Sequence, residues 1–327
     1  MQRRQLLQSL VGAAAGLALP ASSWAAEYPD KAVRLLVPFQ PGSTPDIWAR
    51  GIGSELAKRM GQAFVVENVP GAGGSIGAST VKRAPADGYT LGLFANTQAI
   101  TAHTFKSPPY ELTKDFVAIA PLGGGVSLLT VPAASPIHSG KELVAALKAK
   151  PGEMPFASGG NGSVAHLTVE QLLKQTGTKA LHVPYKGSPD IISSQISGQT
   201  KFGMPIFGSA LSFVKSGQLR ALAITGDKRS PLLPDVPTLK EALPPGFVLS
   251  SWAGVFAPAQ TPAPVVQRLF KEIDAGMRSG ALNTLAEGMG SDIMTLDSQR
   301  AFQAFVNDED QRFGALIKDV NVKVDGR

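Results

Sequence analysis

Two short stretches combine a small polar residue, a proline and an aspartate at points where an apolar run gives way to a helical pattern. Thr44, Pro45 and Asp46 follow AVRLLVPF, and SPD at 188–190 follows VPYKG. These residue types are typical of an N-cap and the first helical positions. A helix start leaves backbone N–H groups without intrahelical partners and carries about half a positive charge, which a carboxylate can satisfy. The repeat predicts two helix starts that face one cleft and hold either a dicarboxylate or one shared carboxylate.

Ordinary helix capping explains both stretches as well, and the sequence leaves this alternative open. Asp46 and Asp190 fit that role, because an acid pointed at an anion would repel it. We therefore assign the two aspartates to the helix starts and expect the ligand to contact backbone N–H groups. Lys186 can add positive charge, although an exposed lysine is the common case, and the amides of Lys186 and Gly187 are better candidates.

Glycine-rich stretches indicate further places where a ligand can approach the backbone closely. GAGGSIG at 71–77 lacks the dinucleotide-binding spacing, because its third glycine falls at Gly77 rather than at position 76. A tight turn explains this stretch equally well. Among the aromatic residues, Phe39, Tyr185 and Phe207 are candidates for the cleft wall, with a core position as the alternative for Phe39. Packing is the expected role of Trp252.

Catalysis and metal binding find little support in the sequence. Ser158 or Ser163 could pair with His166, but no acid is placed to orient the histidine. The four histidines have no metal-ligand spacing. We expect no enzyme activity, no cofactor and no metal. An exported α/β hydrolase or transferase that uses the same cleft is the alternative, and a sensor module is a weaker one.

The elements that would position these residues alternate between strand and helix, which predicts βαβ units on parallel sheets. One expected helix runs from about residue 45 to Met60, with Gly61 as its C-cap, and two more, at about 262–279 and 298–319, close the chain. VSLLTVP at 126–132 and SSWAGVFAP at 250–258 are the expected links between two lobes. We predict an α/β clamshell with lobe 1 at 26–124 plus 252–327 and lobe 2 at 125–251.

The composition indicates an exported globular protein. The 327-residue chain is 43% hydrophobic and has no cysteine, so a core rather than disulfides must hold it together. Residues 1–25 combine Arg3 and Arg4 with a short apolar run and end in SWA, which predicts a signal peptide. Its RRQLLQ motif partly matches a twin-arginine signal, so either the Sec or the twin-arginine route fits.

Charge and hydropathy exclude other classes of partner. Removal of Arg3 and Arg4 lowers the formal net charge from +6 to +4, and the remaining basic residues form no patch interleaved with aromatic residues. We therefore expect no nucleic acid partner. We also expect no membrane insertion once the signal has been removed, because no later stretch is long and apolar enough.

Several motifs in fixed order resemble the Bug family, the periplasmic substrate-binding proteins of tripartite tricarboxylate transporters. They are PFQPGSTPD, ENVPGAGGSIGA, ASGGNGSVAHL, VPYKG, GQLRALAITGDKRSPLLPDVPT and GVFAPAQTPAPVV. The resemblance runs from Tyr28 to the C-terminus. It implies a two-lobed periplasmic-binding-protein fold that captures a small carboxylate for membrane permease subunits, and we expect the protein to be a monomer.

The resemblance also places the family's carboxylate loops on residues 42–44, 158–163 and 185–187. The full set of candidate ligand-binding residues is Phe39, Gly42, Ser43, Thr44, Ala72, Gly73, Ser158, Gly160, Asn161, Gly162, Ser163, His166, Tyr185, Lys186, Gly187 and Phe207.

Two departures from the family pattern bear on the ligand. The chain reads Pro41-Gly42-Ser43 where the family usually has PGG, and FGMPIFGS at 202–209 lacks the acidic residue that relatives often carry. An ammonium group needs an acidic partner when it is buried. We therefore expect plain or aromatic carboxylates, such as adipate-like or terephthalate-like diacids, to bind better than aspartate or glutamate.

Overall fold

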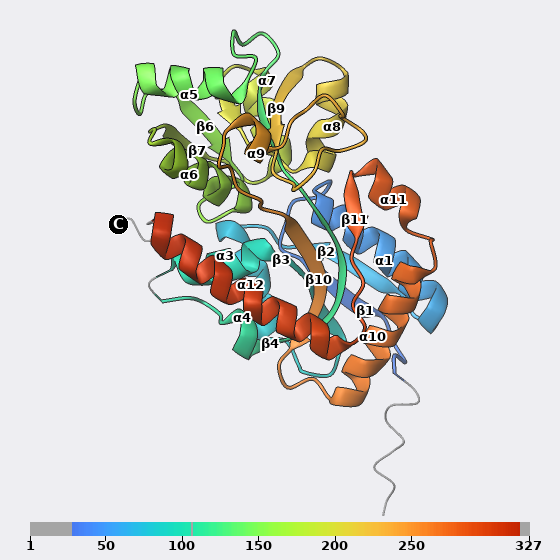
Figure 1. Ribbon diagram of the computed structural model, residues 1–327. Coiled ribbons are helices and arrows are strands. Elements are labelled where there is room, and N and C mark those ends of the chain that lie inside the picture. The colour runs from blue at the N-terminus through green and yellow to red at the C-terminus, as the bar shows by residue number, and fades with distance from the viewer. Residues whose placement is uncertain (1–27, 106, 321–327) are drawn as a thin grey trace, which may run out of the picture.

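The computed structural model describes residues 28–105 and 107–320, and these residues form two α/β lobes, each built around one sheet (Figure 1). The first sheet has the order β11-β4-β10-β3-β1-β2 and the second has the order β7-β6-β8-β5-β9. The first consists of β1 (Val33–Val37), β2 (Phe64–Asn68), β3 (Thr90–Ala95), β4 (Phe116–Gly125), β10 (Ser251–Pro258) and β11 (Ser291–Ile293). The second consists of β5 (Leu128–Pro132), β6 (Pro155–Ser158), β7 (Leu181–Pro184), β8 (Phe202–Gly203) and β9 (Leu219–Ile224).

Both sheets are mixed, so the expectation of parallel sheets is only partly correct. β1 pairs in parallel with β2 and β3, as the βαβ pattern predicts. β10 returns from the second lobe and enters between β3 and β4, antiparallel to both. In the second sheet, β5 is antiparallel to β8 and β9. Four of the antiparallel pairs contain β5 or β10, the strands that follow the two crossings between the lobes.

The chain crosses between the lobes twice. It leaves the first sheet at the end of β4 and enters β5 after Val126 and Ser127, and it returns through residues 249–250 into β10 (Figure 1). The two crossings are tied together, since the Ser251 hydroxyl donates to the carbonyl of Gly125 at 3.0 Å. Strands β5 and β10 are therefore regular sheet members as well as links.

Helices cover the faces of both sheets. Those of the first lobe are α1 (Thr44–Met60), the short 3₁₀ helix η1 (Ala72–Gly74), α2 (Ser75–Lys82), α3 (Asn96–Thr104), α4 (Leu112–Asp115), α10 (Ala263–Arg278), α11 (Asn283–Gly288) and α12 (Gln299–Val320). Those of the second are α5 (Gly140–Ala149), α6 (Val164–Thr176), α7 (Ser188–Ile196), α8 (Phe207–Lys215) and α9 (Leu239–Ala242). The C-cap of α1 is Gly61 with φ 70°, as expected, but its N-cap is Ser43 rather than Thr44.

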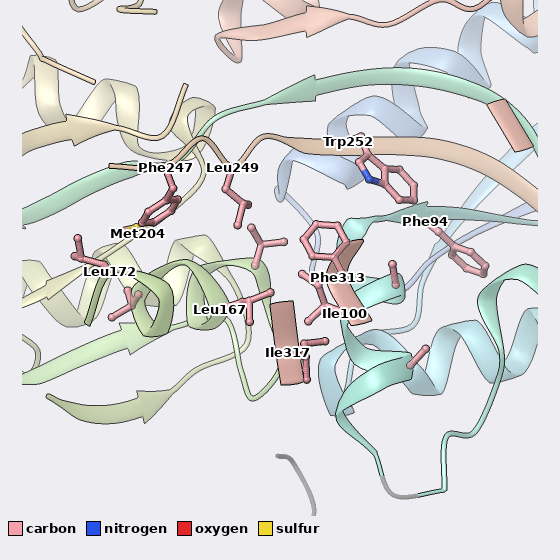
Figure 2. Packing of buried hydrophobic residues seen from close by; sticks show 14 of the residues in the cluster. Phe94, Ile100, Leu167, Leu172, Met204, Phe247, Leu249, Trp252, Phe313 and Ile317 are labelled. Carbon is pink, nitrogen blue, oxygen red and sulfur yellow. The ribbon is translucent and has the colours of Figure 1, made fainter. Parts of the chain in front are cut away.

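The C-terminal part of the chain was under-predicted, because α11 and β11 lie between the two expected helices. β11 adds a short antiparallel edge to β4. The long helix α12 packs on β4 and α3 and also reaches α6 of the second lobe. One buried hydrophobic cluster therefore continues from Phe94 and Trp252 in the first lobe to Leu172 and Met204 in the second (Figure 2).

Candidate functional site: a cleft lined by helix starts

A cavity of about 580 Å³ lies between the two lobes. Residues of the first lobe, the crossing strands and the second lobe all contribute to its wall. The lining residues are Pro38, Phe39, Gln40, Ser43, Thr44, Pro45, Trp48, Pro70, Gly71, Ala72, Gly73, Gly74, Ala95, Asn96, Thr97, Phe105, Gly123, Gly124, Gly125, Gly159, Gly160, Asn161, Ser163, Val164, Ala165, Pro184, Tyr185, Lys186, Gly187, Ser188, Ile191, Ile206, Ser251, Trp252, Ala253 and Ser291.

Helix starts from both lobes meet at this cavity. The first residues of α1, α3, α6 and α7 and the whole of η1 belong to its wall. In α1 the amides of Thr44 and Asp46 make no hydrogen bond with any residue that the structure describes, and Pro45 between them has no N–H. Residues 188–190 at the start of α7 repeat this arrangement. The helix starts therefore present unpaired donors and the positive ends of helix dipoles to one cavity.

The two aspartates turn back into the loops that precede their helices. Asp46 is buried and accepts hydrogen bonds from the Gly42 amide at 2.9 Å, from Arg50 at 3.1 Å and from Asn68 at 2.8 Å. Burial alone would raise the pKa of Asp46, but these three donors together outweigh it and hold the pKa below its usual value. Asp190 accepts from the Lys186 amide at 3.3 Å. Each aspartate thus stabilises the loop that precedes its helix. The backbone amides of Gly42 and Lys186 donate to these carboxylates and are therefore not available to a ligand.

The glycine loop before α2 brings the backbone into the cavity in an uncommon conformation. Positive φ angles occur at four successive residues, Gly71, Ala72, Gly73 and Gly74. Within residues 28–105 and 107–320, Ala72, with φ 46°, is the only residue other than glycine that has a positive φ. A Cβ at Gly73 would lie 3.2 Å from the carbonyl oxygen of Asn161 in the other lobe. The loop thus meets the opposite lobe at the cavity, and only a residue without a side chain fits there comfortably.

The loop 158–163 is held from behind by two histidines. Ser158 pairs with His182, with 2.6 Å between Oγ and Nε2, and it also accepts from the Gly160 amide at 3.1 Å. The rings of His166 and His182 stack with their centroids 3.9 Å apart. Burial, followed by the nearby His166, lowers the pKa of His182 to about 3, so His182 is neutral at ordinary pH. The Gly162 amide donates to His166 Nδ1 at 3.2 Å.

This arrangement corrects the serine–histidine pairs considered from the sequence. Ser158 contacts His182 rather than His166, and Ser158 is fully buried outside the cavity wall. Ser163 uses its hydroxyl to cap α6 by accepting from the His166 amide at 3.2 Å. Ser158 and Ser163 therefore hold the loop through these hydrogen bonds, and neither hydroxyl pairs with the ring of His166.

The structure brings most of the predicted site residues together. Those in the cavity wall are Phe39, Ser43, Thr44, Ala72, Gly73, Gly160, Asn161, Ser163, Tyr185, Lys186 and Gly187. Five do not line it: Gly42, Ser158, Gly162, His166 and Phe207.

Gly42 and Phe207 have other roles. Gly42 has φ 78°, and a Cβ there would meet no atom within 4 Å, so the residue serves the turn rather than close approach of a ligand. Phe207 is buried against Gly290, where a Cβ would lie 2.1 Å from its ring. This contact joins α8 to the loop before β11, and both segments lie beside the first crossing.

Sequence reasoning missed the floor of the cavity and the start of α3. The floor consists of Gly123–Gly125 with Ser251–Ala253 and Ser291. The triple glycine was the available signal, because three successive glycines in a strand indicate close approach of other groups. The N-cap of α3 is alanine, which is not a usual N-cap residue, and the capping signal is Gln98 at the third helical position, which accepts from the Ala95 amide at 2.8 Å.

The charges in the wall favour an anion. Among the described residues of the wall, Lys186 is the cation and no carboxylate is present. Elsewhere in residues 28–105 and 107–320, no group of three His, Asp or Glu side chains could hold a metal ion. No helix in this part of the chain is long and apolar enough to cross a membrane.

Comparisons with known proteins agree with this geometry. Residues 48–322 match the model of the tripartite tricarboxylate transporter family receptor. The chain is 35% identical to protein BugT of Bordetella pertussis over 316 residues, which covers 95% of each chain. Among solved structures it is similar to R. palustris Rpa4515 with adipate, with a TM-score of 0.86, 30% identity and coverage of 90% and 99% of the two chains. It is also similar to the periplasmic binding protein BugD, with a TM-score of 0.85, 31% identity and coverage of 90% and 99%.

These similarities confirm the two-lobed fold and the resemblance noted in the motifs. The relatives are solute-binding receptors rather than enzymes. The chain therefore belongs to the tripartite tricarboxylate transporter receptor family, of which the Bug proteins are members.

Proposed function

We propose that this protein is a periplasmic solute-binding protein that captures a small organic carboxylate, preferably a dicarboxylate or an aromatic carboxylate. It delivers this ligand to the membrane permease of a tripartite tricarboxylate-type transporter. The observation that carries the proposal is that helix starts from both lobes meet at one cavity, and that no Asp or Glu is among the described residues that line it. Such a cavity stabilises an anion and gives an ammonium group no partner.

The apolar part of the wall supports the preference for a diacid or an aromatic ring. Phe39, Trp48, Phe105, Tyr185 and Trp252 all line the cavity. Aromatic side chains supply apolar area and ring-to-ring contacts to a flat or extended ligand body. Adipate, which is present in the Rpa4515 structure, has this form, with an apolar spacer between two carboxylates.

The lobes, proposed as residues 26–124 with 252–327 and residues 125–251, close on the ligand. Gly73 and Asn161 come from opposite lobes and meet beside the cavity, which supports closure as the binding step. After export through the signal at 1–25, the closed monomer presents both lobes to the permease.

A matched pair of ligands tests the proposal. Isothermal titration should show that adipate binds the purified protein more tightly than 2-aminoadipate, which differs by one ammonium group. At a ligand concentration of a hundred times Kd, binding adds about 2.7 kcal/mol to the free energy of unfolding and raises Tm. Failure of every carboxylate in a mono-, di- and tricarboxylate panel to raise Tm would overturn the proposal. Tighter binding of the amino acid would overturn the preference for plain diacids.

A further inference from the structure

Two tryptophans lie in the cavity wall, and their indole N–H groups differ in what they contact. Trp252 donates to Glu309 on α12 at 3.0 Å, and Glu309 does not line the cavity. The indole N–H of Trp48 makes no hydrogen bond with any residue that the structure describes. Both side chains are nonetheless almost fully buried, with 1% of Trp48 and 4% of Trp252 exposed.

The position of Trp48 fixes where its N–H can act. Trp48 lies in α1 one turn after Thr44, so the two side chains share a face of the helix. Its ring packs against Gly123 at the cavity floor, where a Cβ would be only 2.4 Å from Cζ2. A side chain at residue 123 would therefore displace the ring, and the glycine keeps the indole in the wall of the cavity.

A buried indole N–H normally has an acceptor, because leaving the group unpaired costs free energy. Trp252 follows this rule through Glu309. Trp48 lines the cavity and its indole nitrogen is not among the enclosed atoms that lack a partner, so water or a ligand in the cavity can serve as its acceptor. The described wall offers no carboxylate that could take this role.

We propose that the indole N–H of Trp48 donates a hydrogen bond to a second carboxylate of the ligand and thereby selects diacids over monoacids. This inference rests on the proposed carboxylate-binding function. The first carboxylate occupies the helix starts beside Thr44. The Cα atom of Trp48 lies four residues later, about 6 Å along the helix axis, which is the length scale of an extended six-carbon diacid.

The neutral donor suits the second carboxylate. A neutral N–H contributes direction without the strong electrostatic pull of a lysine or an arginine, so the second carboxylate is bound specifically and still leaves readily when the cleft opens. Trp48 would thus act as a specificity-determining residue, while the helix starts supply the common affinity for carboxylates.

The test compares two matched ligand pairs on two matched variants. Adipate with hexanoate and terephthalate with 4-methylbenzoate each differ by the second carboxylate, and calorimetry gives the affinity ratio within each pair. In Trp48→Phe, the diacid should lose about tenfold or more in affinity and the monoacid less than about twofold. Trp252→Phe changes the same wall, so both ligands of a pair should lose affinity to a similar extent, because its N–H is bonded to Glu309 outside the cavity and does not distinguish the second carboxylate.

A second measurement on the unaltered protein covers the case in which Trp48→Phe does not fold. In a ¹⁵N-indole spectrum, assigned with Trp252→Phe, the Trp48 resonance should move on addition of adipate and stay within the linewidth on addition of hexanoate. Equal loss for both ligands in Trp48→Phe, or equal shifts of the Trp48 resonance with both, would overturn the role of Trp48 alone. If neither diacid nor monoacid binds the unaltered protein, the proposed function fails together with this inference.

Discussion

The carboxylate of Asp46 accepts a hydrogen bond from the backbone amide of Gly42 at 2.9 Å, across the turn that leads into α1. Asp190 and Lys186 repeat this relationship at the start of α7, at 3.3 Å. In each case the acid faces the loop behind the helix, so the amides of the first turn remain unpaired at the cavity. At each of the two helix starts, the Pro-Asp pair leaves backbone N–H groups free to donate to a ligand. The aspartate of the pair points away from these N–H groups, into the preceding loop.

Asp46→Asn should lower the free energy of unfolding by about 1.5–3 kcal/mol, because it weakens three hydrogen bonds to a buried charged group. Carboxylate affinity should fall in parallel, since the turn at Gly42 sets the direction of the α1 start. Urea unfolding and calorimetry measure the two effects. Asp190→Asn is the matched control and should cost less stability, because its single contact is longer. Tighter carboxylate binding by Asp46→Asn at unchanged stability would mean that this acid repels the ligand.

Gly73→Ala should weaken ligand binding more than Gly42→Ala does. Both glycines have positive φ, 63° and 78°, so alanine strains the backbone in both. Only at Gly73 would the new Cβ crowd the opposite lobe, 3.2 Å from the Asn161 oxygen. Small-angle scattering with saturating ligand should give a larger radius of gyration for Gly73→Ala than for Gly42→Ala. Equal radii and equal affinities would show that this contact does not limit closure.

The free energy of unfolding should fall as the pH drops from about 6.5 toward 5, partly because of His182. Its pKa is about 3 in the folded protein, whereas an unfolded histidine takes up a proton near pH 6.5. The unfolded state therefore binds more protons in this window, and acidification favours unfolding. Above pH 6.5 both states are neutral and the contribution is fully present.

His182→Gln should flatten this pH dependence, measured as the urea midpoint between pH 7 and 5. His138→Gln, which removes an exposed histidine, is the matched control. The hydrogen bond to Asp310 raises the pKa of His103, so the contribution of His103 to the free energy of unfolding changes with pH in the opposite direction. This contribution is the same in all of these variants. An identical slope in His182→Gln would show that His182 titrates normally in the folded protein.

Lys186→Ala should reduce affinity for a diacid only about threefold or less at physiological salt. The side chain is exposed, so solvent and salt screen its charge. Its backbone amide, which donates to Asp190, is unaffected by the change. Calorimetry at low and high salt measures the effect, which should shrink as salt rises. A loss of a hundredfold that persists in high salt would instead identify Lys186 as the main anchor of the anion.

Much of the fold and part of the site could be predicted, because they rest on local signals. Gly61 marks the end of α1, and the Pro-Asp pairs mark α1 and α7, all by residue type at a fixed offset. The family motifs pointed to the loops around Ser43 and Tyr185, and the glycine-rich stretch pointed to Gly73; all three residues line the cavity.

The remainder depends on contacts between distant residues, which no local pattern encodes. Ser158 is next to the cavity loop in sequence, yet its hydroxyl turns to His182 on the neighbouring strand. Phe207 lies at the start of a helix near the cleft but is buried against Gly290, more than eighty positions away. The start of α3 has alanine at its N-cap, and its capping side chain, Gln98, lies three residues into the helix, so the usual N-cap residue types did not mark this part of the wall in the sequence.

The place of β10 in the first sheet has a consequence for the order in which the protein folds. β10 lies between β3 and β4, yet the whole second lobe precedes it in the chain (Figure 1). The second sheet can form from a continuous segment, whereas the first remains incomplete until residues 251–258 are available. Pairings this distant in sequence slow folding, because the entropy of closing the loop is lost before the contacts form. A chain that ends before Ser251 leaves one edge of β3 open and β4 without either neighbour, and such edges are templates for aggregation.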